Sequence, residues 1–196
     1  VDIKDGGGLH LAIINYFNEK DKIDNSIIES LLEHGADVNC EDSVLHWRPL
    51  RLAEEIRAWY VVDKLLEKET YTTDLIMIKT DIEKNFCNQS LMQATSRQGD
   101  VKYKMSGLSA EVIYTALSEG YVNLVKFILN CGVSVRQYIL HDQHETSMLH
   151  IAAEYGQLKS LHLLIEQGAF INDNISWLNR TPLMQAIVCG HVQVAQ

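Results

Sequence analysis

Apolar residues recur at three- and four-residue steps along much of the chain, a pattern typical of short amphipathic helices. In residues 122–129, for example, Val122, Val125, Ile128 and Leu129 fall on one face of a helix. Such segments come in pairs, and glycine follows the second helix of a pair, where left-handed C-terminal caps are common. The pattern therefore predicts an all-α chain built from helix pairs.

These helix pairs form an internal repeat. Residues 147–172 (SMLHIAAEYGQLKSLHLLIEQGAFIN) align without a gap with residues 111–135 (EVIYTALSEGYVNLVKFILNCGVSV), so that Gly156 falls on Gly120. The same frame fits segments that begin at residues 7, 48 and 181. A single pair cannot bury its apolar face alone, so neighbouring pairs are expected to stack into a continuous core.

Three short segments resemble the consensus of ankyrin repeats, which is T-P-L-H-x-A-A, a glycine, an apolar run and G-A-D-V-N. They are TPL at 181–183, LHIAA at 149–153 and LLEHGADVN at 31–39. The resemblance implies an all-α ankyrin-repeat solenoid of helix-turn-helix units joined by β-hairpin loops. It also implies that Thr181–Pro182 begins a first helix, with proline where no intrahelical N–H bond is needed.

The frame predicts a single array over residues 1–196, with repeats starting near 7, 48, 89, 111, 147 and 181. The start at 89 rests on LMQA at 91–94, which is identical to residues 183–186. Ankyrin repeats are ~33 residues long, so insertions are expected at 18–24 and within 70–88. Residues 70–108 are therefore expected to be degenerate or inserted. The last repeat is expected to be truncated, which makes the chain a fragment of a longer protein.

The stretch HDQHETSMLH at 141–150 could be a metal site, part of a hydrolase, or a polar loop that runs into a helix. The frame places Asp142 in an inter-repeat hairpin, His144 at its tip and His141 just before it. His150 takes the histidine position of T-P-L-H, which in the family bonds turn and neighbouring repeat together. A closed zinc site needs about four ligands, and the stretch is not H-E-x-x-H. We therefore expect no metal ion and no cofactor.

No other motif predicts catalysis. The glycine-rich DGGG at 5–8 follows no strand and precedes no Lys-Ser/Thr pair, as a phosphate loop would require. Cys131 and Cys189 would need a nearby base to act as nucleophiles. Glu54–Glu55 and Asp81/Glu83 are expected on solvated helix faces. These residues are therefore expected to carry no enzymatic activity. The alternative is a targeting or regulatory ankyrin region of a larger enzyme or toxin whose active domain lies elsewhere.

Composition narrows the class of partner. The formal net charge of −9 disfavours nucleic acid, which is bound by neutralising phosphates with Lys and Arg, and favours a partner protein with a basic surface. The apolar runs are too short for membrane insertion, which needs ~20 residues. The four cysteines are widely spaced without a C-x-x-C pair, so reduced thiols and a cytoplasmic location are expected.

The resemblance also implies where a partner binds, namely at the hairpin tips and on the concave face of the first helices. The tips contain two of the three tryptophans, and exposed Trp, Tyr and Arg are common hot spots of interfaces. The alternative is that these tryptophans fold back onto a neighbouring repeat, as large aromatics often do; Trp59 is expected to pack internally. The candidate partner-binding residues are Val44, Leu45, Trp47, Glu55, Ile56, Gln143, His144, Thr146, Glu154, Tyr155, Trp177, Leu178 and Arg180, with Val188 and Cys189 at the last helix.

Two further expectations rest on resemblance alone. LLEHGADVN is similar to the context in which asparagine is hydroxylated in this family, with Asn39 as acceptor; the alternative is that Asn39 stabilises the hairpin through hydrogen bonds. Divergent repeats with insertions are similar to those of ankyrin proteins from intracellular bacteria and viruses that engage host proteins.

Overall fold

The computed structural model of the chain describes residues 7–18, 25–43, 46–68, 74–84, 104–105, 108–141, 144–174, 179–191 and 193. The repeat expected to start near 89 lies outside these residues, as does most of the expected insertion at 18–24. The repeats described below are therefore those that start near 7, 48, 111, 147 and 181.

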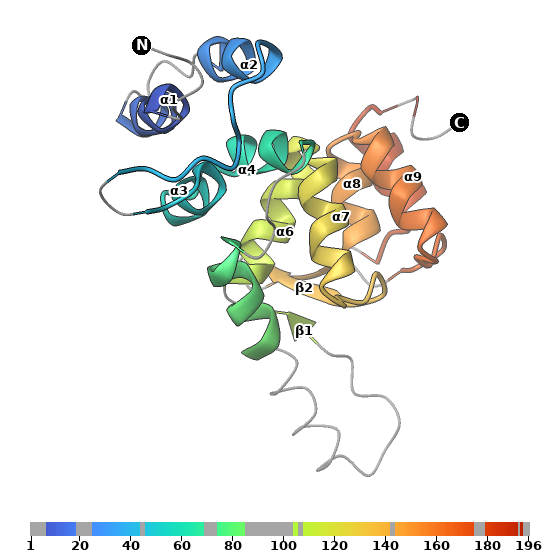
Figure 1. Cartoon of the computed structure of the whole chain (residues 1–196). Coiled ribbons are helices and arrows are strands. Elements are labelled where there is room, and N and C mark those ends of the chain that lie inside the picture. Colours follow the sequence, from blue (N-terminus) through green and yellow to red (C-terminus); the bar gives the residue numbers. More distant parts are fainter. Residues whose placement is uncertain are drawn as a thin grey trace. The chain divides into compact units, whose positions relative to one another are not determined.

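Helices follow one another in pairs, as the apolar periodicity predicts, and the all-α repeat fold is confirmed (Figure 1). In four repeats a first helix is followed by a second, and α10 is the first helix of the last repeat. A helical segment at 76–84 lies between α4 and α6 in the chain. The bounds are α1 Gly7–Asn18, α2 Ser26–Glu33, α3 Pro49–Glu55, α4 Trp59–Leu66, α6 Leu108–Glu119, α7 Val122–Asn130, α8 Met148–Glu154, α9 Leu158–Glu166 and α10 Pro182–Val188.

Left-handed residues end most of the first helices. Equivalent glycines after α6, α8 and α10 have positive φ angles. After α3 the equivalent residue is Arg57, which also has a positive φ angle, 57°. The helix α1 has Tyr16 at this position and continues to Asn18. The expected start of α10 is confirmed, since Pro182 is its first residue and the Thr181 Oγ1 accepts a hydrogen bond from the Met184 N–H.

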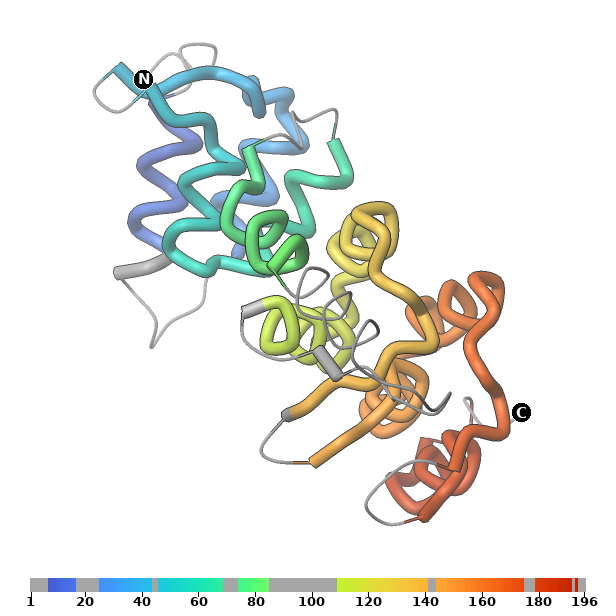
Figure 2. The backbone as a smooth tube through the Cα atoms, turned by 90° about the horizontal axis from the view of Figure 1, so that it is seen from below, coloured from blue at the N-terminus to red at the C-terminus, as the bar shows by residue number. Residues whose placement is uncertain are grey.

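A β-hairpin joins α7 to α8. Strand β2 (Tyr138–His141) pairs antiparallel with β3 (His144–Ser147), and β1 (Lys104–Met105) pairs parallel with β2. The two hairpin strands run side by side in Figure 2. An inter-repeat hairpin is thus confirmed at this junction. The expected place of His141 is wrong, because this residue lies within β2 opposite His144 rather than before the hairpin.

The core runs between the layers of first and second helices. In four repeats the residue at the leucine position of T-P-L-H is at most 3% exposed; these residues are Leu9, Leu50, Ile113 and Leu149. In α10 the equivalent Leu183 is 49% exposed. Burial in the earlier repeats therefore depends on helices that follow in the chain, as expected for stacked repeats.

The expectation of a solvated helix face is wrong for Glu54 and holds only in part for Asp81, which is half-buried. Glu54 is fully buried in α3, where its carboxylate lies 3.4 Å from the Arg51 guanidinium. The Asp81 carboxylate accepts hydrogen bonds from the backbone N–H and the hydroxyl of Ser109, at 2.7 and 2.6 Å. These bonds satisfy the first turn of α6, which begins at Leu108, three residues before the expected repeat start.

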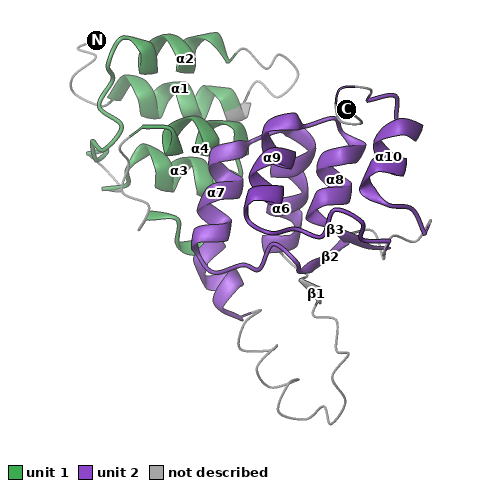
Figure 3. Cartoon of the chain, turned by 90° about the vertical axis from the view of Figure 1, so that its right-hand side faces the viewer, with its two compact units in different colours: residues 1–77 green, residues 78–196 purple. Residues whose placement is uncertain are grey.

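The chain divides into two compact units, residues 1–77 and 78–196 (Figure 3). Unit 1 contains α1 to α4, and unit 2 contains α6 to α10 with the three-stranded sheet. Within unit 2, α8 lies between α6 and α10. Among the described residues, no helix is long and apolar enough to cross a membrane.

Candidate protein-binding surface

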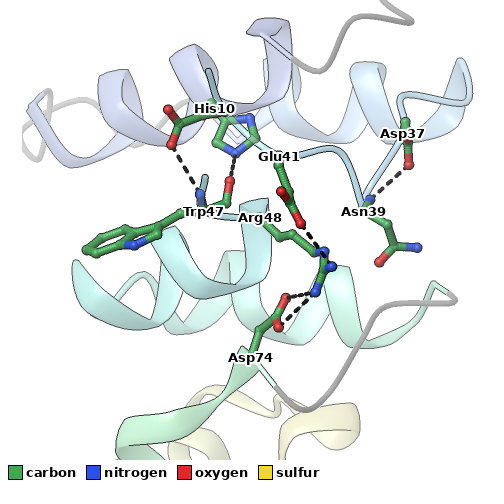
Figure 4. Close-up of polar contacts among 8 residues, drawn as sticks. His10, Asp37, Asn39, Glu41, Trp47, Arg48 and Asp74 are labelled. Atoms are coloured by element: carbon green, nitrogen blue, oxygen red, sulfur yellow. Dashed lines mark hydrogen bonds and ion pairs between the residues drawn. The ribbon is translucent and has the colours of Figure 1, made fainter. Parts of the chain in front are cut away.

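Buried histidines connect neighbouring repeats by the same hydrogen bond in both units. In unit 1 the His10 Nε2–H donates to the carbonyl oxygen of Trp47 at 2.8 Å (Figure 4). In unit 2 the His150 Nε2–H donates to the carbonyl oxygen of Arg180 at 2.7 Å. Each acceptor lies immediately before the N-cap residue of the next repeat's first helix, so the structural role expected for His150 is confirmed.

The second ring nitrogen of His150 is also occupied. Because Nε2 carries the proton, Nδ1 accepts from the Ser147 hydroxyl at 2.7 Å, and the Ser147 Oγ in turn accepts from the His150 N–H. Ser147 thereby caps α8. One imidazole nitrogen thus links neighbouring repeats, and the other bonds to the residue that caps α8. Among the described residues, no group of three or more His, Cys, Asp or Glu side chains could hold a metal ion.

A second set of side-chain links ties the C-terminal ends of the first helices together in unit 2. The Gln157 Nε2 donates to the carbonyl oxygen of Ser118 at 2.7 Å, which connects α8 to α6. The His191 Nε2–H donates to the carbonyl oxygen of Glu154 at 2.8 Å, which connects the end of α10 to α8. Gln157 and His191 occupy equivalent repeat positions, so the same link recurs at both junctions.

These links need the glycines that end α6 and α8. A Cβ atom on Gly120 would lie 2.4 Å from the Gln157 Oε1, and one on Gly156 would lie 2.5 Å from the His191 Nδ1. Both glycines also have φ angles near +75°, at +79° and +70°. Both the left-handed backbone and the close approach of a neighbouring side chain therefore require glycine at positions 120 and 156. The links hold the three first helices in fixed register.

The linked helices present one surface, here called the first-helix face of unit 2. The equivalent repeat positions at the ends of the three helices are Ser118 and Glu119, Glu154 and Tyr155, and Val188 and Cys189. Tyr155 is 41% exposed and Val188 is 61% exposed. The structure thus brings together four candidates expected from the sequence, namely Glu154, Tyr155, Val188 and Cys189.

Tyr114 also belongs to this face and was not expected there. Its hydroxyl lies 2.8 Å from the hydroxyl of Tyr155, and the rings meet edge to face with centroids 6.1 Å apart and an interplanar angle of 84°. Tyr114 occupies the histidine position of its repeat, which the sequence frame treats as structural. An aromatic residue in place of histidine was the signal that could have identified it.

The corresponding face of unit 1 is compensated in charge. The Arg51 guanidinium lies 3.4 Å from the carboxylates of both Glu54 and Glu55. It also lies 5.5 Å from the ring centroid of Trp47, in cation–π geometry. Three neighbours therefore share one cation, and two candidates, Trp47 and Glu55, already have an internal partner. Ile56, the third candidate on this helix, is half-buried.

The start of the second repeat is held by a network of charges rather than by a capping hydroxyl. The Arg48 guanidinium lies 3.0 Å from the Glu41 carboxylate and 3.1 Å from the Asp74 carboxylate (Figure 4).

In the preceding turn the Asn39 N–H donates to the Asp37 Oδ1 at 2.9 Å. The turn around Asn39 is thus stabilised through Asp37, and hydroxylation of Asn39 stays a prediction.

The remaining candidates are dispersed. His144 is exposed at the hairpin, while Thr146 is half-buried opposite Ile139. Arg180 is half-buried next to α10, and its carbonyl accepts the bond from His150. Trp59 is buried, as expected. Five candidates lie outside the described residues: Val44, Leu45, Gln143, Trp177 and Leu178.

Turns after the second helices also contact each other in unit 2. The Arg136 guanidinium lies 4.3 Å from the ring centroid of the exposed Phe170, and the Arg136 Nε–H donates to the carbonyl oxygen of Gly168.

The Tyr138 hydroxyl donates to the Asp173 carboxylate at 3.0 Å. Burial, together with this bond and the charge of Asp173, raises the pKa of Tyr138 from 10.0 to about 12.

Two of the described cysteines have raised pKa values. Cys40, Cys131 and Cys189 are free thiols. Burial raises the pKa of Cys40, and the nearby Asp37 carboxylate raises it further. Burial also raises the pKa of Cys131. A raised pKa keeps these two thiols protonated, whereas nucleophilic cysteines have lowered pKa values.

A family model for ankyrin repeats, in three copies, matches residues 83–175 and 112–196, which together make up more than half of the chain. The chain belongs to the ankyrin-repeat family. The two ankyrin repeats of unit 1 lie outside the matched residues, but they share with unit 2 the bond from histidine to the next repeat. Ankyrin repeats are generally protein–protein interaction modules and are typically non-catalytic.

Proposed function

We propose that this chain is a protein-binding scaffold and that its partner docks on the first-helix face of unit 2 and on the hairpin at His144. The observation that carries the proposal is the pair of the half-buried Tyr114 and the exposed Tyr155 on helices that are held in register by side-chain links. A surface that is ordered before binding loses little conformational entropy when a partner docks. Exposed Tyr is also common among residues that dominate binding energies.

Charge indicates the kind of partner. Among the described residues, no Lys, Arg or His side chain lies within ion-pair distance of Glu119 or Glu154. With a net charge of −9 for the chain, these acids favour a protein with a basic surface over nucleic acid. Trp47, Glu55 and Ile56 of unit 1 are weaker candidates because Arg51 already pairs with two of them.

We place this binding in the cytoplasm, because a reducing compartment keeps thiols such as the exposed Cys189 free. An effector role directed at host proteins would use the same surface. The source of the captured partner would distinguish that role from one inside the protein's own cell.

Affinity capture from cell lysate, quantified by mass spectrometry, tests the proposal. Three variants accompany the parent chain: Glu154→Ala with Tyr155→Ala on the first-helix face, His144→Ala at the hairpin, and Lys159→Ala with His162→Ala on the exposed side of α9. Circular dichroism verifies that each variant folds. We expect one protein to be captured by the parent and the α9 variant and lost by the first-helix variant. Equal capture by all baits, or loss only with the α9 variant, would contradict the proposed surface.

A further inference from the structure

The first helices of unit 2 carry acidic side chains but no Lys or Arg, whereas its second helices carry charges of both signs. The first helices α6, α8 and α10 contain no Lys or Arg, and their acidic residues are Glu111, Glu119 and Glu154. The second helix α7 contains Lys126, and the second helix α9 contains Lys159 and Glu166; all three side chains are exposed. The first-helix face is therefore acidic in its own right, and not only because the whole chain is acidic.

Glu119 and Glu154, which have no ion-pair partner among the described residues, hold repeat positions next to or equivalent to that of Tyr155. Glu154 precedes Tyr155 in the chain, and Glu119 holds the same repeat position as Tyr155 on the neighbouring helix, to which Gln157 ties α8. The hydroxyl–hydroxyl bond to Tyr114 fixes the Tyr155 ring while leaving 41% of the residue exposed. An oriented aromatic ring beside carboxylates attracts a cation both through its π face and through the neighbouring negative charge.

An apolar side chain adjoins this acidic and aromatic centre. His191 ties the end of α10 to the carbonyl of Glu154, and Val188 lies three residues before His191 on the exposed side of α10. The face therefore offers an exposed aromatic residue with one glutamate next to it in the chain and another at the equivalent position of the neighbouring helix, and an aliphatic side chain one helix further along. This order of surface chemistry is complementary to a segment that carries a cation next to an aliphatic residue.

We propose that the first-helix face of unit 2 receives a cationic, amphipathic segment of its partner protein, with an Arg or Lys side chain over Tyr155 and between Glu119 and Glu154. An aliphatic side chain of the same segment contacts Val188. Arginine fits better than lysine, because its planar guanidinium stacks on aromatic rings and pairs with carboxylates in a fixed geometry. The inference rests on the proposed function and specifies the partner's chemistry at the same surface.

Selection of peptides from a random phage-displayed library against the whole chain tests this chemistry without a known partner. We expect enriched peptides to contain Arg or Lys beside aliphatic residues. One enriched peptide and its Arg/Lys→Gln analogue are then titrated against the parent, Tyr155→Ala, the double variant Glu119→Gln/Glu154→Gln, and the control Glu83→Gln/Glu166→Gln. The control removes the same charge from exposed positions of unit 2 outside the face.

We expect the Glu119→Gln/Glu154→Gln variant to weaken peptide binding about three- to tenfold, as for two partly exposed ion pairs. Tyr155→Ala is expected to weaken it about tenfold or more, as for a central interface residue. The control should change the affinity less than about twofold, and added salt should weaken binding to the parent. Loss of the peptide's cation should cost as much as loss of the two carboxylates.

Enriched peptides that are neutral or acidic, an affinity that survives Glu119→Gln/Glu154→Gln, or no enrichment at all would overturn the inference. Lysate capture distinguishes failure of this inference from failure of the proposed function. If lysate capture still depends on Tyr155 or His144 while basic peptides bind elsewhere, the chain binds protein at this surface but not through a cationic segment. If capture depends on neither residue, the proposed function itself fails.

Discussion

Units 1 and 2 use the same helix-pair repeat but tie neighbouring repeats together in different ways. Both use a buried histidine, His10 or His150, to reach the next repeat's first helix. Only unit 2 adds side-chain links at the C-terminal ends of its described first helices, through Gln157 and His191. The equivalent residue in unit 1 is Ala58, which has no group that could form such a bond. A fixed register of first helices is thus a local property, added where polar side chains occupy this position.

The acidic side chains of the first helices also have different surroundings in the two units. In unit 1, Arg51 pairs with the buried Glu54 and the exposed Glu55, so the negative charge is used for internal stability. In unit 2 the corresponding buried positions are apolar, at Leu117 and Ala153, and the acids Glu119 and Glu154 stand at the surface. The same repeat therefore uses its glutamates internally in one unit and leaves them available to a partner in the other.

Arg51→Ala should reveal this difference most strongly. It leaves Glu54 buried without its cation, so unit 1 should lose about 2–4 kcal/mol in its free energy of unfolding. Urea unfolding, followed by the fluorescence of Trp47 and Trp59, measures the loss. Addition of Glu54→Leu, which copies Leu117 of unit 2, should recover most of it. A double variant no more stable than Arg51→Ala would show that the ion pair is not the cause.

Gly156→Ala tests the links of unit 2. The left-handed φ of 70° and the displaced His191 ring should together cost about 2–3 kcal/mol, from strain and a lost hydrogen bond. Gly190→Ala is the matched control, because Gly190 has φ 81° but no atom within 4 Å of an added Cβ. It should cost about 1–2 kcal/mol from the backbone conformation alone. Equal losses in chemical denaturation would mean that the His191 link contributes nothing.

Tyr138→Phe should make unit 2 less sensitive to alkali. The folded state raises the pKa of Tyr138 to about 12, above the ordinary 10.0, so folding favours the protonated phenol. The resulting stability is complete below pH 10 and is lost as pH rises from there towards 12. At neutral pH the variant should lose about 1 kcal/mol, the bond to Asp173. Parallel unfolding curves at neutral and alkaline pH test this, and an unchanged alkaline loss in the variant would contradict it.

Of these substitutions, Arg57→Gly should change the free energy of unfolding least, and it alone should increase it. It places glycine where unit 1 has a left-handed residue with φ 57°, as unit 2 does after α6 and α8. Relief of backbone strain, offset by the greater freedom of glycine in the unfolded chain, should stabilise unit 1 by about 0.5–1 kcal/mol. Thermal unfolding measures the change, and a destabilised variant would show that contacts of the Arg57 side chain outweigh the strain.

What could be predicted from the sequence depended on local chemistry. Thr181–Pro182 as the start of α10 and His150 as a packing residue each follow from residue types at fixed repeat positions. Glu54 was wrongly assigned to solvent although its partner Arg51 lies only three residues away, and the half-buried Asp81 has its hydrogen-bond partner Ser109 28 residues along the chain. Tyr114 was missed because its contact with Tyr155 lies between two repeats; the aromatic residue at a histidine position is a signal within one repeat, but it does not identify the partner.

The central claim, that partners bind on the first-helix face of unit 2, is tested most directly by site-specific photo-cross-linking in cells. A benzoylphenylalanine replaces Tyr155, and in separate chains it replaces Glu55 of unit 1 or His162 on α9. We predict a discrete cross-linked protein from position 155, less of it from position 55, and none from position 162. Cross-links of equal yield from all three positions, or a product from position 162 alone, would contradict the account.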